Sequence, residues 1–432
     1  PHQRPVAQAA LTPPRLRPRM APVKRLAIFV VLFFALITAP AATSAAADKE
    51  PDLDAKAWAL IDARTGETLA DQDADEHLPM ASTTKMMTAY LALRSLPMDR
   101  MVRAANYVPG DPAESLMGLE TGQKISVRDL LYGLIMLSGN DAAHTLAIEV
   151  SGSEERFVAR MNLAAAMLGL DDTHFRNPIG LDAEGHYTSA ADLAKLGRVL
   201  MDMPRFRPIA GARTAVLKSY NPPLTIENID TFLLNNEWAR GIKTGHTLKA
   251  GYVLASDGRR RATELIATVI GAPTEASRDE ESVRLLDYGF SLYTKEVPLR
   301  QGKPFTSLPV KFEDGDLKVL AARSARIGVR KDERLKVATN LPDEVEGPIS
   351  KGERIGMARV TVDGDLIAAV PLRAAKAIAE PSLADRIRAV VSTWWPLLLL
   401  VAFAILAVVV IVVRRRRDAD LQRRIKRVGR RQ

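Results

Sequence analysis

Three short motifs, each found once in the chain, carry groups suited to acyl transfer. In chain order they are Ser82-Thr83-Thr84-Lys85, Ser138-Gly139-Asn140 and Lys243-Thr244-Gly245. A serine hydroxyl is a poor nucleophile until a base takes its proton, and a lysine is such a base once burial or a second cation lowers its pKa. Lys243 is the candidate second cation for Lys85. The set predicts a serine enzyme that forms a covalent acyl intermediate.

The residues around Ser82 predict the start of a helix. Apolar residues recur at helical spacing from Met86 to Leu93. The free N–H groups and partial positive charge of a helix N-terminus suit an oxyanion that forms beside Ser82. Lys85, three residues later, lies on the same helix face.

The second motif follows a predicted helix over residues 127–137, which Ser126 and Asp129 begin as a capping box. Ser138 then lies just past the helix end, where its hydroxyl can relay a proton between Lys85 and the leaving group. The Asn140 amide can hold both Lys85 and a substrate carbonyl. Taken alone, an ordinary polar loop is the favoured interpretation of this triplet.

The third motif lies in a predicted antiparallel sheet. Residues 239–247, 251–254 and 265–270 have strand patterns, with a turn at Asp257-Gly258. The motif is then an edge-strand element beside a cleft. The alternative is a solvated lysine at a strand end.

The chemistry expected at this edge is carboxylate and oxyanion binding. Lys243 and Thr244 can bind a substrate carboxylate, and Gly245 leaves room for the substrate backbone. The backbone N–H near His246 can complete an oxyanion hole.

Together with their surroundings, the three motifs resemble the serine D-alanyl-D-alanine carboxypeptidases, the low-molecular-weight penicillin-binding proteins. The resemblance extends to residues 58–62, 65–70, 79–90, 177–182, 186–190 and 241–252. Ile179 departs from the pattern, because many relatives have histidine there. We expect this substitution to affect local packing rather than the reaction.

The resemblance implies an α/β (α+β) fold, a penicillin-binding/β-lactamase-like transpeptidase domain with an antiparallel sheet and a helical lobe. It implies Ser82 as the acylated nucleophile, Lys85 as the general base, and Ser138 and Asn140 as proton relay and substrate clamp. The residues implied to bind substrate are Lys243, Thr244, Gly245, His246 and Arg278. A helix-surface ion pair of Arg278 with Glu275 or Glu281 explains that arginine equally well.

The implied function is removal of the terminal D-alanine from peptidoglycan stem pentapeptides through a Ser82 acyl-enzyme, with β-lactam antibiotics as inhibitors. The alternatives are a DD-endopeptidase, a β-lactamase-like hydrolase and a catalytically silent wall-binding protein. A class A β-lactamase needs a glutamate-activated water, and no convincing E-x-x-L-N stretch is present; the intact motifs oppose the silent protein. The chain has no cysteine, which excludes a cysteine nucleophile, and no H-E-x-x-H motif, so the sequence does not support a zinc carboxypeptidase. We expect no metal or cofactor.

The basic residues concentrate at the two ends of the chain. The formal net charge is +9, but residues 1–26 hold six Lys and Arg and residues 414–432 hold ten, so the body is mildly acidic. We therefore expect no nucleic-acid partner. Residues 1–47 read as an N-terminal extension and signal peptide, with basic, apolar and small-residue regions in order.

The C-terminal end predicts a membrane anchor. An apolar run over residues 394–413 opens with Trp394-Trp395 and stops at four arginines. About twenty helical residues span about 30 Å, enough for a bilayer. Interfacial tryptophans and a basic cluster predict that the tail at 414–432 is cytoplasmic and that the catalytic body lies outside the cell membrane.

Two domains are predicted between these ends. Residues 48–295 form the catalytic domain, and residues 296–380 form a small β-sandwich-like domain followed by a linker at 381–393. Apolar–polar alternation and turns at Asp314-Gly315 and Asp363-Gly364 support the β assignment. No catalytic constellation occurs there, so a spacer or a protein-binding role is expected.

Overall fold

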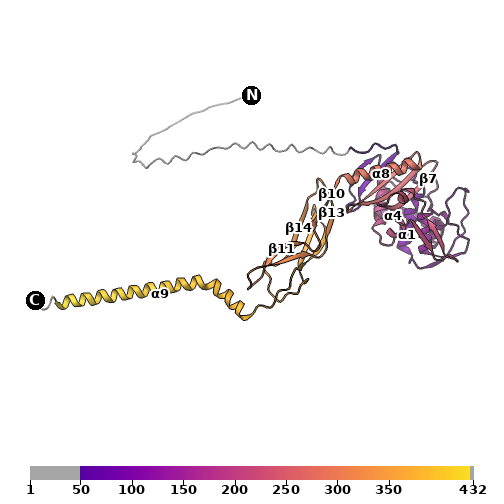
Figure 1. Ribbon diagram of the computed structural model, residues 1–432. Helices are drawn as coiled ribbons and strands as arrows, with labels where there is room; N and C mark the ends of the chain where they lie inside the picture. The colour runs from indigo at the N-terminus through magenta and orange to yellow at the C-terminus, as the bar shows by residue number, and fades with distance from the viewer. Residues whose placement is uncertain (1–48, 429–432) are drawn as a thin grey trace, which may run out of the picture. The chain divides into compact units, whose positions relative to one another are not determined.

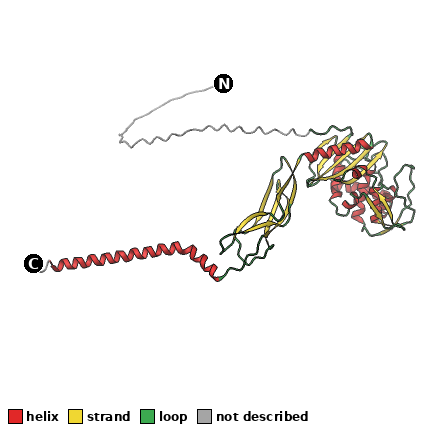
Figure 2. Ribbon diagram, in the orientation of Figure 1, coloured by secondary structure: helices red, strands yellow, loops and turns green. Residues whose placement is uncertain are grey.

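The computed structural model describes residues 49–428. The predicted N-terminal extension and signal peptide, together with the last residues of the predicted tail, lie outside this range. Figure 1 labels the elements along the chain, and Figure 2 separates helices from strands.

A five-stranded antiparallel sheet forms the framework of the first domain, with strand order β2-β1-β9-β8-β7. Its strands are β1 (Ala57–Asp62), β2 (Thr68–Gln72), β7 (Ala239–Thr247), β8 (Gly251–Arg260) and β9 (Thr263–Ala272). The central strands are buried over most of their length because helices cover both faces of the sheet. β7, which carries the third motif, lies at the edge as predicted.

The predicted turn at Asp257-Gly258 is wrong. Both residues lie inside β8, paired with Ile266 and Leu265 of β9. The chain instead reverses at Arg261 and Ala262, which have φ angles of +52° and +83°. A Cβ on Gly258 would lie 2.7 Å from the Trp238 ring, so this glycine serves aromatic packing within a strand.

Two helices sandwich the sheet. α8 (Glu275–Ser291) lies on one face, where Leu285 and Leu286 pack into a cluster with Trp58. α5 (Ala190–Met201) lies on the other face, where Leu193 and Leu196 join the larger core. This arrangement confirms the predicted antiparallel sheet flanked by helices.

A helical lobe packs on the α5 side around fully buried Leu130, Leu146 and Phe157. Its helices are α1 (Lys85–Ser95), α2 (Val127–Met136), α3 (Asn140–Ser151) and α4 (Glu154–Leu168). The shorter elements are η1 (Ala81–Thr84), β3 (Met101–Arg103), β4 (Lys124–Ser126), α6 (Arg207–Ala210), β5 (Thr214–Leu217), β6 (Leu224–Glu227) and α7 (Thr231–Asn235).

The start of α2 differs in detail from the predicted capping box. The Ser126 hydroxyl accepts the N–H of Asp129 at 3.1 Å, as predicted. The reciprocal contact comes from Ser219, whose hydroxyl accepts the Ser126 N–H at 2.9 Å. The Asp129 carboxylate accepts the Ser219 N–H at 2.7 Å instead, so a distant segment completes the cap.

The second domain is all β, as predicted. A five-stranded sheet has the order β11 (Pro304–Pro309), β12 (Asp316–Ala321), β16 (Asp365–Ala374), β15 (Arg354–Val362) and β14 (Leu335–Asn340). β10 (Tyr293–Leu299) and β13 (Ala325–Arg330) form a second, two-stranded sheet. The predicted turn at Asp363-Gly364 is confirmed, with φ angles of +49° and +102° between β15 and β16.

The last described element is α9 (Leu383–Val428), one helix of 46 residues. It begins at Leu383, so most of the segment predicted as a linker is helical. Within it, Trp394–Arg423 is long and apolar enough to cross a membrane by length and composition, and is the only such candidate among the described residues. This span contains the predicted one.

Candidate active site

The turn over residues 80–84, termed the nucleophile turn, carries the candidate nucleophile Ser82 and has a strained backbone. Ser82 lies in η1, directly before α1, as predicted. The preceding Ala81 has a φ of +47°, a left-handed conformation that costs a non-glycine residue about 1–2 kcal/mol. Ser82 is partly exposed while its neighbours are buried, so the turn presents one hydroxyl.

Lys85 is placed to take the proton of that hydroxyl. Its Nζ lies 2.9 Å from Ser82 Oγ and 2.6 Å from the Ile179 carbonyl oxygen, and the side chain is fully buried. Burial, and then the positive charge of Lys243, hold the pKa of Lys85 well below its usual value, against the opposing effect of Glu114 and Asp141. A neutral amine beside Ser82 is the form that accepts a proton.

The Ile179 carbonyl is held on Lys85 by a tight turn. The Asn177 side-chain oxygen accepts the N–H groups of Ile179, Gly180 and Leu181 at 2.6–3.2 Å. Gly180 has a φ of +95°, and a Cβ there would fall 2.0 Å from the Ala81 carbonyl oxygen. The sequence predicts only a packing role at Ile179, because a backbone carbonyl leaves no mark in the residue pattern.

The second motif joins α2 to α3. Ser138 is 4% exposed and has a φ of +58°, so this motif serine is itself left-handed, whereas at the first motif the left-handed residue is Ala81, directly before the serine. Asn140 is also 4% exposed, and its amide nitrogen donates to Glu114 Oε2 at 2.7 Å. The motif is therefore at a helix junction as predicted, but the partner of the Asn140 amide is a loop glutamate that the sequence does not indicate.

The third motif lies on β7 against the nucleophile turn. A Cβ on Gly245 would lie 3.0 Å from both the Ser82 backbone nitrogen and the Ala81 Cβ. The space that the sequence assigns to the substrate backbone is thus filled by the protein's own turn. Thr244 is buried, while His246 is exposed and stacks on Tyr252 at a ring distance of 4.1 Å.

Lys243 is the second buried lysine of the site, 1% exposed, and its Nζ donates to the Thr244 carbonyl at 2.8 Å. Burial lowers its pKa to about 7; Asp230 raises the pKa and Arg278 lowers it further. Near neutral pH this lysine is therefore part charged and able to attract a carboxylate.

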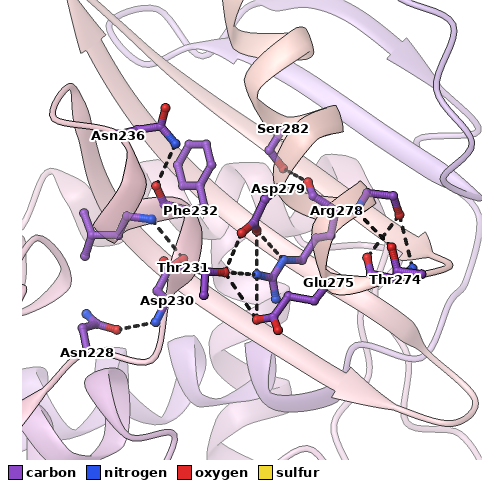
Figure 3. A network of polar contacts seen from close by, with 12 residues as sticks. Asn228, Asp230, Thr231, Phe232, Asn236, Thr274, Glu275, Arg278, Asp279 and Ser282 are labelled. Carbon is purple, nitrogen blue, oxygen red and sulfur yellow. Dashed lines mark hydrogen bonds and ion pairs between the residues drawn. The ribbon is translucent and has the colours of Figure 1, made fainter.

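Arg278 is buried in a polar network at the start of α8 (Figure 3). Its guanidinium donates to Asp279 at 2.6 and 2.8 Å and to the Thr231 hydroxyl at 3.1 Å. It also pairs with Glu275 at 3.3 Å, one of the two predicted alternatives. Glu281 instead accepts the Ala55 N–H at 3.1 Å. Because Arg278 influences the pKa of Lys243, it belongs to the same electrostatic environment.

His186 is hydrogen-bonded to the nucleophile turn through the Thr84 hydroxyl. Its Nδ1 accepts the Arg176 N–H at 2.9 Å, so the proton is on Nε2, which donates to the Thr84 hydroxyl at 2.9 Å. That hydroxyl donates to the Ala81 carbonyl at 2.9 Å. Burial lowers the pKa of His186 to about 4, so it is neutral at physiological pH. No metal-binding group of histidines and acids occurs among residues 49–428.

Comparison with known proteins identifies the family. The model described as D-alanyl-D-alanine carboxypeptidase matches residues 43–274. The chain belongs to this family. A second model, described as penicillin-binding protein 5, C-terminal domain, matches residues 293–380. The chain is 32% identical over 403 residues to D-alanyl-D-alanine carboxypeptidase DacA of Escherichia coli (strain K12), which covers 86% of this chain and 98% of that protein.

Another curated relative and a solved structure match this chain at similar identity. DacF of Bacillus subtilis (strain 168) is 30% identical over 352 residues, covering 79% of this chain and 90% of the relative. Penicillin-binding protein 5 from Haemophilus influenzae has a TM-score of 0.53 at 30% identity, over 77% of this chain and 99% of that structure. The chain is accordingly a serine carboxypeptidase of this family that binds penicillin, with the predicted mixed fold.

Proposed function

We propose that Ser82 is the nucleophile that carries the acyl group and that Lys85 is its general base. One observation carries this assignment. Lys85 is fully buried and has a lowered pKa, and its Nζ lies 2.9 Å from the hydroxyl of Ser82. Ser82 is partly exposed, whereas the other two hydroxyl residues of the turn are buried. Lys85 takes the Ser82 proton as Oγ attacks the carbonyl between the two D-alanine residues. The N–H groups at the start of α1 and on β7 stabilise the oxyanion.

The remaining roles follow from the positions of the motifs. Ser138 relays the proton to the departing D-alanine, and Asn140 clamps the stem peptide. Lys243, Thr244 and Arg278 bind the terminal carboxylate, and the His246 backbone completes the oxyanion hole, with Gly245 allowing β7 to reach Ser82. Water then hydrolyses the acyl-enzyme. The substrate is the stem pentapeptide of peptidoglycan, and β-lactams acylate the same serine.

Covalent labelling tests the assignment. Fluorescent penicillin should form a stable adduct that peptide mass spectrometry maps to Ser82, and Ser82→Ala should abolish it. Lys85→Arg should lose acylation by orders of magnitude although its charge is kept, because a guanidinium does not give up its proton. An adduct on another residue, or normal acylation by Lys85→Arg, would refute these roles.

We also propose that the enzyme is held at the cell membrane by α9, with the catalytic domain on the outer side. The uncharged residues 397–413 and the Arg414–Arg417 cluster support a spanning helix with a cytoplasmic tail. The second domain acts as a spacer or docks a protein partner, since none of the proposed catalytic residues comes from it.

A further inference from the structure

Glu114 connects an irregular loop, residues 104–123, to the second motif. Its Oε1 accepts the N–H groups of Gly110 and Asp111 at 2.7 and 3.2 Å. Its Oε2 accepts the Tyr107 hydroxyl and, at 2.7 Å, the amide nitrogen of Asn140. Burial would raise the pKa of Glu114, but these hydrogen bonds hold it below its usual value, so the group is a carboxylate.

An ionised carboxylate accepts hydrogen bonds and donates none, so it selects one of the two orientations of the Asn140 amide. The nitrogen must face Glu114, and the oxygen must point the opposite way. The second amide hydrogen is left for another partner. Asn140 is 4% exposed, so no bulk solvent competes for this choice.

The loop is held in place independently of that contact. Asp141 accepts the N–H groups of Met117, Gly118 and Leu119, each at 2.9 Å. The Asn140 backbone N–H donates to the Ser115 carbonyl at 2.8 Å. A change at the Glu114 side chain therefore leaves the backbone of the loop anchored at the start of α3.

We propose that Glu114 is a positioning residue that fixes the orientation of the Asn140 amide for acylation. With the nitrogen turned to Glu114, the oxygen is available to the Lys85 amine during proton transfer, and the second N–H is available to a substrate carbonyl. The proposal rests on the roles of Ser82, Lys85 and Asn140 given above. The family pattern of three motifs does not contain this residue.

Glu114→Gln is the decisive variant, because the fixed N–H groups of Gly110 and Asp111 claim the single amide oxygen of glutamine. The glutamine NH₂ group then faces Asn140 and favours the reversed amide. We expect the second-order rate of acylation by fluorescent penicillin, measured on the full chain in detergent, to fall about ten- to a hundredfold. Asp111→Asn is the matched control, since it removes a carboxylate charge from the same loop at a side chain that accepts the Ala113 N–H at 2.8 Å rather than bonding Asn140. Its acylation rate should stay within about threefold of the wild-type rate.

Exchanging the amide and the carboxylate between positions 114 and 140 tests whether the orientation of the side chain at 140 matters, or only the presence of a hydrogen bond there. Asn140→Asp alone sets two carboxylates against each other and should acylate poorly. Glu114→Gln combined with Asn140→Asp lets the glutamine NH₂ donate to the new carboxylate, which leaves the other carboxylate oxygen for the proposed contact with Lys85. The double variant should acylate about tenfold faster than Asn140→Asp alone. Equal rates for these two variants would overturn the proposal.

The pH profile distinguishes this role from a purely structural one. The charged groups that act on Lys85 are Lys243, Glu114 and Asp141. Removing the Glu114 charge lowers the pKa of Lys85, so the acidic limb of the acylation profile should move to lower pH in Glu114→Gln and stay in place in Asp111→Asn. Wild-type rates and an unmoved limb in Glu114→Gln would overturn the proposal, whereas labelling that survives Ser82→Ala would overturn the active-site assignment itself.

Discussion

At the scale of single residues, the site holds two buried lysines with different proposed tasks. In the proposed reaction Lys85 is neutral and takes a proton, while Lys243 is charged and attracts a carboxylate. Burial is the largest influence on both lysines and lowers the pKa of each. The charge of Asp230 then favours the protonated form of Lys243, whereas the charge of Lys243 disfavours the protonated form of Lys85.

The pKa of Lys243 predicts a basic limb in the pH profile. Below about 7 this lysine is protonated and attracts the substrate carboxylate; above about 7 it loses that charge. We expect kcat/KM for a pentapeptide with a free C-terminus to fall as the pH rises through this range. The amidated analogue should lack this limb, so a shared limb would remove Lys243 from carboxylate binding.

Arg278→Gln tests the buried network at the start of α8. The change removes a cation that lowers the pKa of Lys243, so the basic limb should move to higher pH. The KM for the free-carboxylate substrate should rise more than that for the amidated analogue. If the basic limb of the pH profile does not move and KM rises equally for both substrates, Arg278 serves only to hold α8 against Thr231.

At the scale of elements, two glycine-containing segments fix the nucleophile turn. Gly245 on β7 approaches the Ser82 nitrogen, and Gly180 approaches the Ala81 carbonyl from the opposite chain segment. The strained φ of Ala81 persists because backbone packs on both flanks of the turn.

Gly180→Ala and Gly122→Ala make a matched pair. Both glycines have positive φ angles, +95° and +82°, so alanine strains either backbone by about 1–2 kcal/mol. A Cβ at Gly122 meets nothing within 4 Å, whereas at Gly180 it overlaps the Ala81 carbonyl. Calorimetry should show a further loss of about 2–4 kcal/mol for Gly180→Ala, with slower penicillin acylation. Equal free energies of unfolding for the two variants would show that the backbone at Gly180 shifts at little cost.

The sequence predicts an element correctly where the residues that determine it are close together in the chain. Ser82 at a helix start, β7 at a sheet edge and the Asp363-Gly364 turn all follow from nearby residues. The turn at Asp257-Gly258 fails because Trp238, distant from any hairpin pattern, fills the space at Gly258. Glu114 and the Ile179 carbonyl were not predicted, since an irregular loop and a backbone oxygen reach the site only through tertiary contacts.

At the scale of the whole molecule, the apolar part of α9 should determine where the enzyme resides. A chain that ends at Pro381 lacks this helix and should be released as soluble protein that still binds penicillin. The complete chain should resist extraction by alkaline carbonate or high salt and require detergent, because residues 397–413 have no polar face. Extraction without detergent would contradict a spanning helix.

The glycine contacts on both sides of the nucleophile turn also bear on how a bacterial population could evolve tolerance to β-lactams through this enzyme. Side chains cannot be added at Gly180 or Gly245 without displacing the backbone that carries Ser82. Heritable changes that slow drug acylation yet spare the fold should therefore arise mainly in residues 104–123, where Glu114 reaches the site through a side chain. Sequencing of resistant lineages would reveal where such changes accumulate.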